Sequence, residues 1–430
     1  MAKFIMWKKP EKPVSIDTSQ VVIGLHVWLD LSWDDHPFLY NRFKISDDKQ
    51  VAMIKALSIP GKLYYYPGKS TASPTPLVER TELDALPAPD AVAEADFARE
   101  MQRQNKEKHD RLWQQKDVAA RADRAWEQAA RVTREAMLGM GRAPKVAGAQ
   151  LRDLSQNTAN QIAQGQEVLL HLLGDKEGDG PQFHALNVMT LAMLMGKSVG
   201  LNEAQLAELA LGSLAHDVGK FNIPAHILKS KLRAKHEESF YREHGAYGLE
   251  LATLSGVFGP AALSGITDHH EFLDGTGWPT GKKNPGPIAR IVALADRYDR
   301  LCSPESPDRE AVMPSEALAR LFKLESSKFD QRLLGTLIKL LGVYPPGSLV
   351  QLNDESLALV VSSSKESLRP IVLIYSPEVD KREAPTVDLS LVAGLKIEEV
   401  LRPSSLPPDV LQWMNPRQRL SYFFTTDKPS

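Results

Sequence analysis

The chain has 430 residues, which suits two or three domains because single hydrophobic cores stop growing near ~250 to 300 residues. Its formal net charge of −2 gives no electrostatic case for binding long nucleic acid, and no apolar run approaches the ~18 to 20 residues that span a bilayer, so we expect no membrane insertion. The single cysteine, Cys302, excludes an internal disulfide framework and fits a reducing cytoplasm, where we expect the protein to be located.

Residues 12–89 are typical of a small α+β domain. Residues 21–29 and 62–66 are rich in β-branched, apolar and aromatic side chains and predict strands, and residues 47–57 between them predict a short helix. A proline-rich polar stretch, residues 67–89, then interrupts regular structure and ends this domain.

A long helix is predicted next, because residues 90–138 contain neither proline nor glycine and are dominated by strong helix formers. Asp90 is available as the N-cap and Gly139 lies near the end, so we place this connecting helix at residues 90–142. Its apolar positions are too irregular for a sustained heptad repeat. A homodimer through a coiled coil at residues 90–138 and a single helix packed on its own domains therefore both stay open.

Residues 143–347 predict a helical bundle, since the pattern from residue 150 to 341 is almost entirely helical. Beyond Gly342 the character changes, and residues 348–430 predict a β-containing C-terminal extension. The segments that alternate like strands are 348–352, 357–361 and 371–375. The predicted fold class is therefore multidomain and mainly α.

Histidines and acids within the bundle indicate a function. The string His216-Asp217-Val218-Gly219-Lys220 stands at the end of an apolar segment, and His269-His270-Glu271 precedes a glycine-rich loop. Imidazole and carboxylate together suit iron, manganese or a similar divalent metal. Adjacent helical side chains diverge by about 100°, so His216 and Asp217 can serve two metals only if the two oxygens of Asp217 lie between them.

The other candidate ligands are dispersed along the chain. His184, His244 and Asp296 fall on separate predicted helices, as we expect for His269 and His270 too, and a helical bundle can aim such residues inward. A lone histidine is usually structural. Purely structural roles for the whole set do not readily explain why two compact strings of histidine and acid occur in one apolar bundle. We therefore predict a metal site.

These strings resemble the HD-GYP family of metal-dependent phosphohydrolases over residues 150–347. His216-Asp217 matches the "HD", and Gly277-Trp278-Pro279 matches the naming tripeptide with tryptophan in place of the usual tyrosine. The resemblance implies a phosphodiesterase of bacterial second-messenger signalling that hydrolyses cyclic di-GMP to pGpG and/or GMP. Residues 33–38 resemble part of an uncharacterised domain often found ahead of HD-GYP domains.

The resemblance also implies the residues of the site. The metal ligands would be His184, His216, Asp217, His244, His269, His270 and Asp296. Some members bind a third metal through a glutamate where this chain has Gly180, so two ions, iron or manganese, are expected. Asp217 and Lys220 would be catalytic, with Lys220 on the scissile phosphate. Substrate contacts would come from Lys220, Gly277, Trp278, Pro279 and Arg309, and the supporting groups that orient ligands or the loop would be Glu271 and Asp274.

Two other functions stay open. The family's Arg-Pro-Tyr-Arg-like string is largely missing from residues 304–309, which leaves room for an HD hydrolase acting on another cyclic dinucleotide or nucleotide. The other function is a cyclic di-GMP sensor with weakened catalysis. Seven metal-binding side chains are more than a sensor needs, which favours the enzyme.

Overall fold

The computed structural model describes residues 12–31, 35–38, 41–57, 59–77, 91–163, 168–172, 180–230, 232–304, 311–364, 366–376, 381, 384, 386–392, 394–414 and 422–426. Contacts divide the chain into two units. The first comprises Met1–Asp117, Leu349–Leu359 and Val372–Asn415. The second comprises Val118–Ser348, Val360–Ile371 and Pro416–Ser430.

The N-terminal part of the first unit is a four-stranded antiparallel sheet in the order β1-β4-β2-β3. Its elements are β1 (Val14–Ser15), β2 (His26–Leu29), β3 (Arg42–Lys44), α1 (Asp48–Ala56) and β4 (Leu63–Tyr65). The predicted helix and the second predicted strand are confirmed. The strand predicted from residue 21 begins only at His26, because Gly24 adopts a φ of 95° that ends extended pairing.

The C-terminal third of the chain contributes further strands, most of whose residues belong to the first unit. Strand β6 lies between β10 and β7 and is antiparallel to both, and β8 pairs with β7 and β9. The bounds are β6 (Leu349–Leu352), β7 (Leu357–Ser362), β8 (Ile371–Ile374), β9 (Thr386–Asp388), β10 (Ile397–Leu401) and α13 (Pro408–Met414). The three strands predicted here are confirmed.

Helix α2 (Ala91–Gly139) confirms the predicted long helix. The helix continues past the boundary between the two units, and its last turns belong to the second unit. There Trp126 stacks on Phe183 at a ring-centroid distance of 5.1 Å. This contact packs the second half of α2 against the start of the helix that carries His184.

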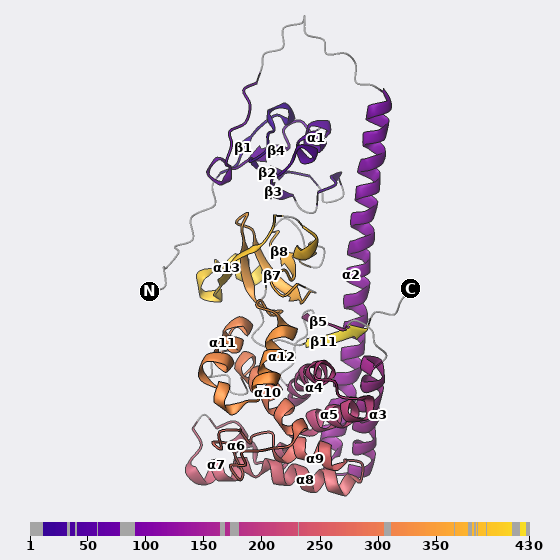
Figure 1. The fold of residues 1–430 in the computed structure, drawn as a ribbon, viewed down its shortest axis with the longest axis vertical. Coiled ribbons are helices and arrows are strands. Elements are labelled where there is room, and N and C mark those ends of the chain that lie inside the picture. Colours follow the sequence, from indigo (N-terminus) through magenta and orange to yellow (C-terminus); the bar gives the residue numbers. More distant parts are fainter. Residues whose placement is uncertain are drawn as a thin grey trace, which may run out of the picture. The chain divides into compact units, whose positions relative to one another are not determined.

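The second unit is a bundle in which α5 contacts four other helices, α3, α4, α9 and α10 (Figure 1). The helices are α3 (Pro144–Ala163), α4 (Pro181–Ser198), α5 (Glu203–Ala215), α6 (Ala225–Leu228), α7 (Lys235–Arg242), α8 (His244–Ser255), α9 (Pro260–Thr267), α10 (Pro287–Cys302), α11 (Pro314–Leu324) and α12 (Gln331–Leu341). Every residue of α4 from His184 to Gly196 is buried, as expected for a helix that is apolar on all sides. The predicted fold class, multidomain and mainly α, is confirmed.

Short 3₁₀ helices connect several of these elements, and one of them matters for the site. They are η1 (Thr18–Gln20), η3 (Pro67–Lys69), η4 (Val218–Asn222), η5 (Ser326–Lys328), η6 (Leu389–Leu391) and η7 (Pro403–Ser405). The helix η4 follows α5 directly and carries Lys220. Among the described residues, no helix is both long enough and apolar enough to cross a membrane.

One stretch of the bundle differs from the prediction of an almost entirely helical region. Strand β5 (Val168–Leu172) pairs antiparallel with β11 (Tyr422–Thr426). A five-residue, mostly apolar run does not distinguish a strand from a buried helical segment, and the partner of β5 lies in a distant part of the sequence. The prediction of helix was therefore wrong at this point.

The N-terminal sheet should be sensitive to acid through His26. Burial, reinforced by the cations Lys69, Arg42 and Lys44, lowers the pKa of His26 from 6.5 to about 4. Between these values the unfolded chain binds a proton that the folded domain does not, so stability falls as the pH falls from 6.5 towards 4, by on the order of 3 kcal/mol. Denaturant unfolding of wild type and His26→Phe at both ends of this window should show a weaker pH dependence in the variant. Equal pH dependence in both proteins would contradict this assignment.

Candidate metal centre

The folded bundle brings all seven predicted ligands together from separate elements. His184 comes from α4, His216 and Asp217 from the end of α5, His244 from the first position of α8, His269 and His270 from the turn after α9, and Asp296 from α10. Six of the seven are buried and His270 is partly buried. His269 and His270 were expected on a helix, which was wrong, because α9 ends at Thr267.

Asp217 lies between two groups of histidines. Its Oδ2 is 3.7 Å from Nε2 of His184 and 3.4 Å from Nε2 of His216. Its Oδ1 is 3.4 Å from Nε2 of His244 and 3.8 Å from Nε2 of His269. One carboxylate therefore presents one oxygen to each group, as predicted for a ligand shared by two metals.

We define two half-sites on this basis. The first half-site is His184, His216 and Asp296 with Oδ2 of Asp217. Nε2 of His184 is 3.0 Å from Oδ1 of Asp296 there, and Nε2 of His216 is 3.6 Å from the same oxygen. The second half-site is His244, His269 and His270 with Oδ1 of Asp217. In this second group, ligand atoms from all four residues lie within 4.8 Å of one another.

The ends of three helices orient three of the rings. In each case Nδ1 lies within hydrogen-bond distance of the carbonyl three residues earlier, in the last turn of a helix whose carbonyls lack helical partners. The pairs are His216 with Ser213 at 2.7 Å, His244 with Tyr241 at 2.8 Å and His269 with Ile266 at 2.9 Å. A carbonyl only accepts, so Nδ1 carries the proton and Nε2 is turned towards Asp217.

The histidines of the two half-sites differ in their pKa values. Burial lowers the pKa of His244 to about 4 and holds the pKa values of His269 and His270 well below 6.5. These rings are therefore neutral at pH 7, the form that binds metals. Burial also disfavours charge on His216, but the Asp217 and Asp296 carboxylates outweigh it and raise the pKa of His216 to about 9.

The second half-site has the features that a cation would satisfy. The Nε2 atoms of His244 and His269 are 3.3 Å apart, and because both rings are neutral with Nδ1 protonated, neither can donate to the other. Among the described residues, Oδ1 of Asp217 and Nε2 of His270 are buried without a hydrogen-bond partner. Leaving such groups unpaired costs ~1 to 3 kcal/mol or more each. The donor set, imidazole with carboxylate and no thiolate, fits a divalent metal.

Positively charged neighbours keep Asp217 ionised. Burial favours the neutral acid, but the ammonium of Lys220 lies 2.8 Å from Oδ2, and His216 and Arg300 add to its effect. Together they hold the pKa of Asp217 well below its usual value. Lys220 is itself buried, and its ammonium also lies 5.4 Å from the centre of the Tyr241 ring.

Sequence reasoning missed two residues of α10 that touch the ligands. Oδ2 of Asp299 accepts a hydrogen bond from Nδ1 of His184 at 2.6 Å, which turns Nε2 of that ring inward. Arg300 donates to Oδ1 of Asp296 and to Oδ2 of Asp217, both at 2.6 Å. Their positions three and four residues after Asp296 place them on the same helical face, and this spacing was the available signal.

The two predicted supporting acids organise the loop and not the histidines. Glu271 accepts from the backbone N–H groups of Thr280 and Lys282 at 2.7 and 2.8 Å. Asp274 accepts from the hydroxyl and backbone N–H of Thr276, and the hydroxyl contact is the largest cause of its lowered pKa. Glu271 and Asp274 were expected to orient either the ligands or the loop, and these contacts are all with the loop.

The tripeptide Gly277-Trp278-Pro279 lies beside the second half-site. The Trp278 ring lies 4.0 Å from the His270 ring at an angle of 32°, and its backbone N–H donates to the carbonyl of His270. A side chain at position 277 would overlap the carbonyl of His270, so only glycine permits this contact. Pro279 is exposed, and Arg309 lies outside the described residues.

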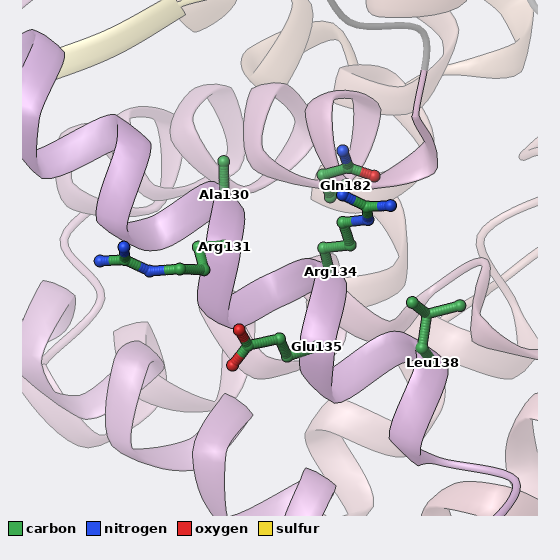
Figure 2. A pocket seen from close by; sticks show the side chains of 6 residues that line it. All are labelled: Ala130, Arg131, Arg134, Glu135, Leu138 and Gln182. Carbon is green, nitrogen blue, oxygen red and sulfur yellow. The ribbon is translucent and has the colours of Figure 1, made fainter.

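A separate groove of about 480 Å³ lies on α2 beside the start of α4 (Figure 2). Its lining residues are Ala130, Arg131, Arg134, Glu135, Leu138 and Gln182. None of them is a predicted ligand, so the groove is distinct from the metal centre.

Comparisons with known proteins cover the part of the chain that holds these residues. A family model described as an HD domain matches residues 149–333, and one described as a domain of unknown function (DUF3391) matches residues 14–151. The resemblance to the HD-GYP family and to an uncharacterised N-terminal domain is confirmed.

Three relatives illustrate the likeness. A cyclic di-GMP phosphodiesterase of Pseudomonas aeruginosa is 27% identical over 244 residues, 55% of this chain and 58% of the relative. The cyclic di-GMP phosphodiesterase PdeB of Borreliella burgdorferi is 25% identical over 52% of this chain and 60% of the relative. The 3'3'-cGAMP-specific phosphodiesterase 3 of Vibrio cholerae is 31% identical over 38% of this chain and 35% of the relative. The chain thus spans less than two thirds of each of these relatives.

Gly219 sets the spacing between the Asp217 segment and α8. A side chain there would overlap the carbonyl of His244 and the backbone nitrogen of Gly248, so η4 would have to move away from α8. We expect Gly219→Ala to lower the metal content of manganese-loaded, dialysed protein and to lower stability by ~1 to 3 kcal/mol, as overpacking does. Gly335→Ala, at a helical position with no atom within 4 Å of the new methyl group, is the matched control. Full metal content and unchanged stability in Gly219→Ala would contradict the assignment.

Proposed function

We propose that this protein is a metal-dependent phosphodiesterase that hydrolyses cyclic di-GMP to pGpG and/or GMP. The observation that carries the proposal is the buried Asp217 carboxylate, which presents one oxygen to each of two histidine groups. The HD domain and the relatives named as cyclic di-GMP phosphodiesterases support the same reaction.

The proposed cofactors are two divalent ions, iron or manganese. His184, His216 and Asp296 would hold one ion, His244, His269 and His270 the other, and Asp217 both. When bound, such ions supply a low-pKa water and neutralise charge on a phosphodiester. The mixed imidazole and carboxylate ligands support iron or manganese, and Gly180, the N-cap of α4, offers no side chain for a third ion. Elemental analysis of metal-saturated protein should give about two ions per chain.

The chain's own residues then have distinct tasks. Lys220 places a compact positive charge at Oδ2 of Asp217, where it can also stabilise negative charge on the substrate phosphate. Trp278, held on the His270 ring, offers an aromatic face for the substrate. We propose Gly277, Pro279 and Arg309 as further substrate contacts. Glu271 supports them by fixing the loop at Thr280.

The remaining parts of the proposal concern the whole chain. We propose a small domain at 12–89, a helical linker at 90–142, the catalytic domain at 143–347 and a C-terminal extension at 348–430. Dimerisation through the helix at 90–138 stays a prediction, and so does a cytoplasmic location.

A second candidate substrate follows from one comparison. The Vibrio cholerae relative is named as specific for 3'3'-cGAMP, and the stretch at 304–309 departs from the family's usual substrate-binding string. Anaerobically purified, metal-loaded protein should therefore be assayed against cyclic di-GMP, 3'3'-cGAMP and other cyclic dinucleotides, with products separated chromatographically. Preferred cleavage of cyclic di-GMP supports the proposal. Preferred cleavage of another dinucleotide would replace its substrate, and binding without cleavage would favour a sensor.

Asp217 provides the first mutational test. Asp217→Ala should abolish turnover and remove much of the bound metal, because a methyl group cannot replace either carboxylate oxygen. Asp217→Asn keeps the shape of the side chain and guards against misfolding. Glu271→Gln should be milder, of the order of the ~10 to 100-fold loss typical of supporting groups. Asp153→Ala is the control, because the side chain of Asp153 is exposed. Near-normal activity of Asp217→Ala would show that the shared ligand has been misassigned.

Lys220 provides the second mutational test. Lys220→Ala should reduce hydrolysis by about 100-fold, the loss typical of one preorganised charge-stabilising donor, with metal content and fold intact. An ammonium has no lone pair for a metal, so metal analysis separates a substrate role from a ligand role. Lys323→Ala, exposed on α11, is the control. Unchanged turnover together with a small loss of thermal stability would assign Lys220 a purely structural role.

A further inference from the structure

Arg300 makes the two half-sites unequal. Its guanidinium bridges the only two carboxylates of the seven predicted ligands, with Nε on Oδ1 of Asp296 and a terminal nitrogen on Oδ2 of Asp217. Both distances are 2.6 Å, and the Arg300 side chain is 15% exposed. We propose that Arg300 competes with a divalent cation for the first half-site, so that the second half-site fills first. The inference rests on the proposed metal centre and is independent of which nucleotide is cleaved.

The oxygens used by Arg300 are those that a cation in the first half-site requires. Asp296 offers Oδ1 to both His184 and His216, and Asp217 offers Oδ2 to the same two rings. A guanidinium is always charged and carries five N–H donors, so Arg300 can neutralise both carboxylates with one donor on each. Each carboxylate oxygen has two lone pairs, so a cation that takes these oxygens has to share them with the guanidinium or displace it.

Among the described residues, no cationic side chain bridges the ligands of the second half-site. Oδ1 of Asp217 and Nε2 of His270 have no hydrogen-bond partner there, and Arg300 and Lys220 both contact Asp217 at Oδ2. The cations near Asp217 therefore lie on the side of the first half-site. A metal entering the second half-site gains ligands without displacing a charged group.

Electrostatics adds to the competition for oxygens. A dication beside an unmoved guanidinium in a buried site is repelled, because two like charges a few ångströms apart are weakly screened there. Arg300 can move, since its side chain is partly exposed, long and flexible. Occupation of the first half-site should thus be coupled to withdrawal of Arg300 from Asp217 and Asp296.

The test is a Mn²⁺ titration of metal-stripped full-length protein, with free Mn²⁺ counted by electron paramagnetic resonance. Wild type should bind one ion per chain at least about tenfold more tightly than the second. Arg300→Gln, which removes the charge, should tighten the weaker step and bring the two affinities within about threefold. Arg297→Gln is the matched control, because Arg297 lies on the same helix and its guanidinium pairs with Glu325 instead of with a predicted ligand. It should bind as wild type does.

Arg300→Lys keeps a positive charge but loses the two-point bridge, so its second affinity should lie between wild type and Arg300→Gln; it also serves if Arg300→Gln does not fold. Equal affinities in wild type, or a second step that Arg300→Gln leaves unchanged or weakens, would overturn the role of Arg300 and leave the phosphodiesterase proposal intact. Failure of wild type to bind any Mn²⁺ at the ligand cluster would instead overturn the metal centre itself.

Discussion

The position of the Asp217 carboxylate between two histidine groups is the constraint that the surrounding structure serves. It requires the end of α5, the start of α8, the turn after α9 and the middle of α10 to converge on one buried point. The last turns of α5, α7 and α9 supply the carbonyls that hold three rings in one orientation. Gly219 lets the segment after Asp217 approach α8 closely. Elements that look like ordinary helix ends are therefore parts of the site.

A buried cluster of this kind is costly without cations. Asp217, Asp296 and Asp299 are all nearly inaccessible to solvent, and an unpaired buried carboxylate would be strongly destabilising. Lys220 and Arg300 supply positive charge on the side of Oδ2, and His184 bonds to Asp299. The side of Oδ1 depends on neutral rings only. Stability and metal binding consequently involve the same atoms, which explains why the charges around Asp217 are distributed unevenly.

Much of the fold and the site could be predicted from the sequence, because the informative signals are local. The long helix at 90–138 follows from composition, and the strings at 216–220 and 269–271 stand out as compact chemistry. Strand β5 could not be predicted, since its pairing with β11 is made across the chain. Arg300 was overlooked because an arginine on an amphipathic helix is ordinarily a surface residue, and only folding shows that its head reaches Asp217.

The central claim is that Asp217 is shared by two ions, and anomalous scattering from crystals of manganese-saturated protein tests it most directly. The account predicts two manganese peaks, one beside His184, His216 and Asp296 and the other beside His244, His269 and His270, with a different oxygen of Asp217 bound to each. A single peak at saturation, or peaks that leave either oxygen of Asp217 without a metal, would contradict it.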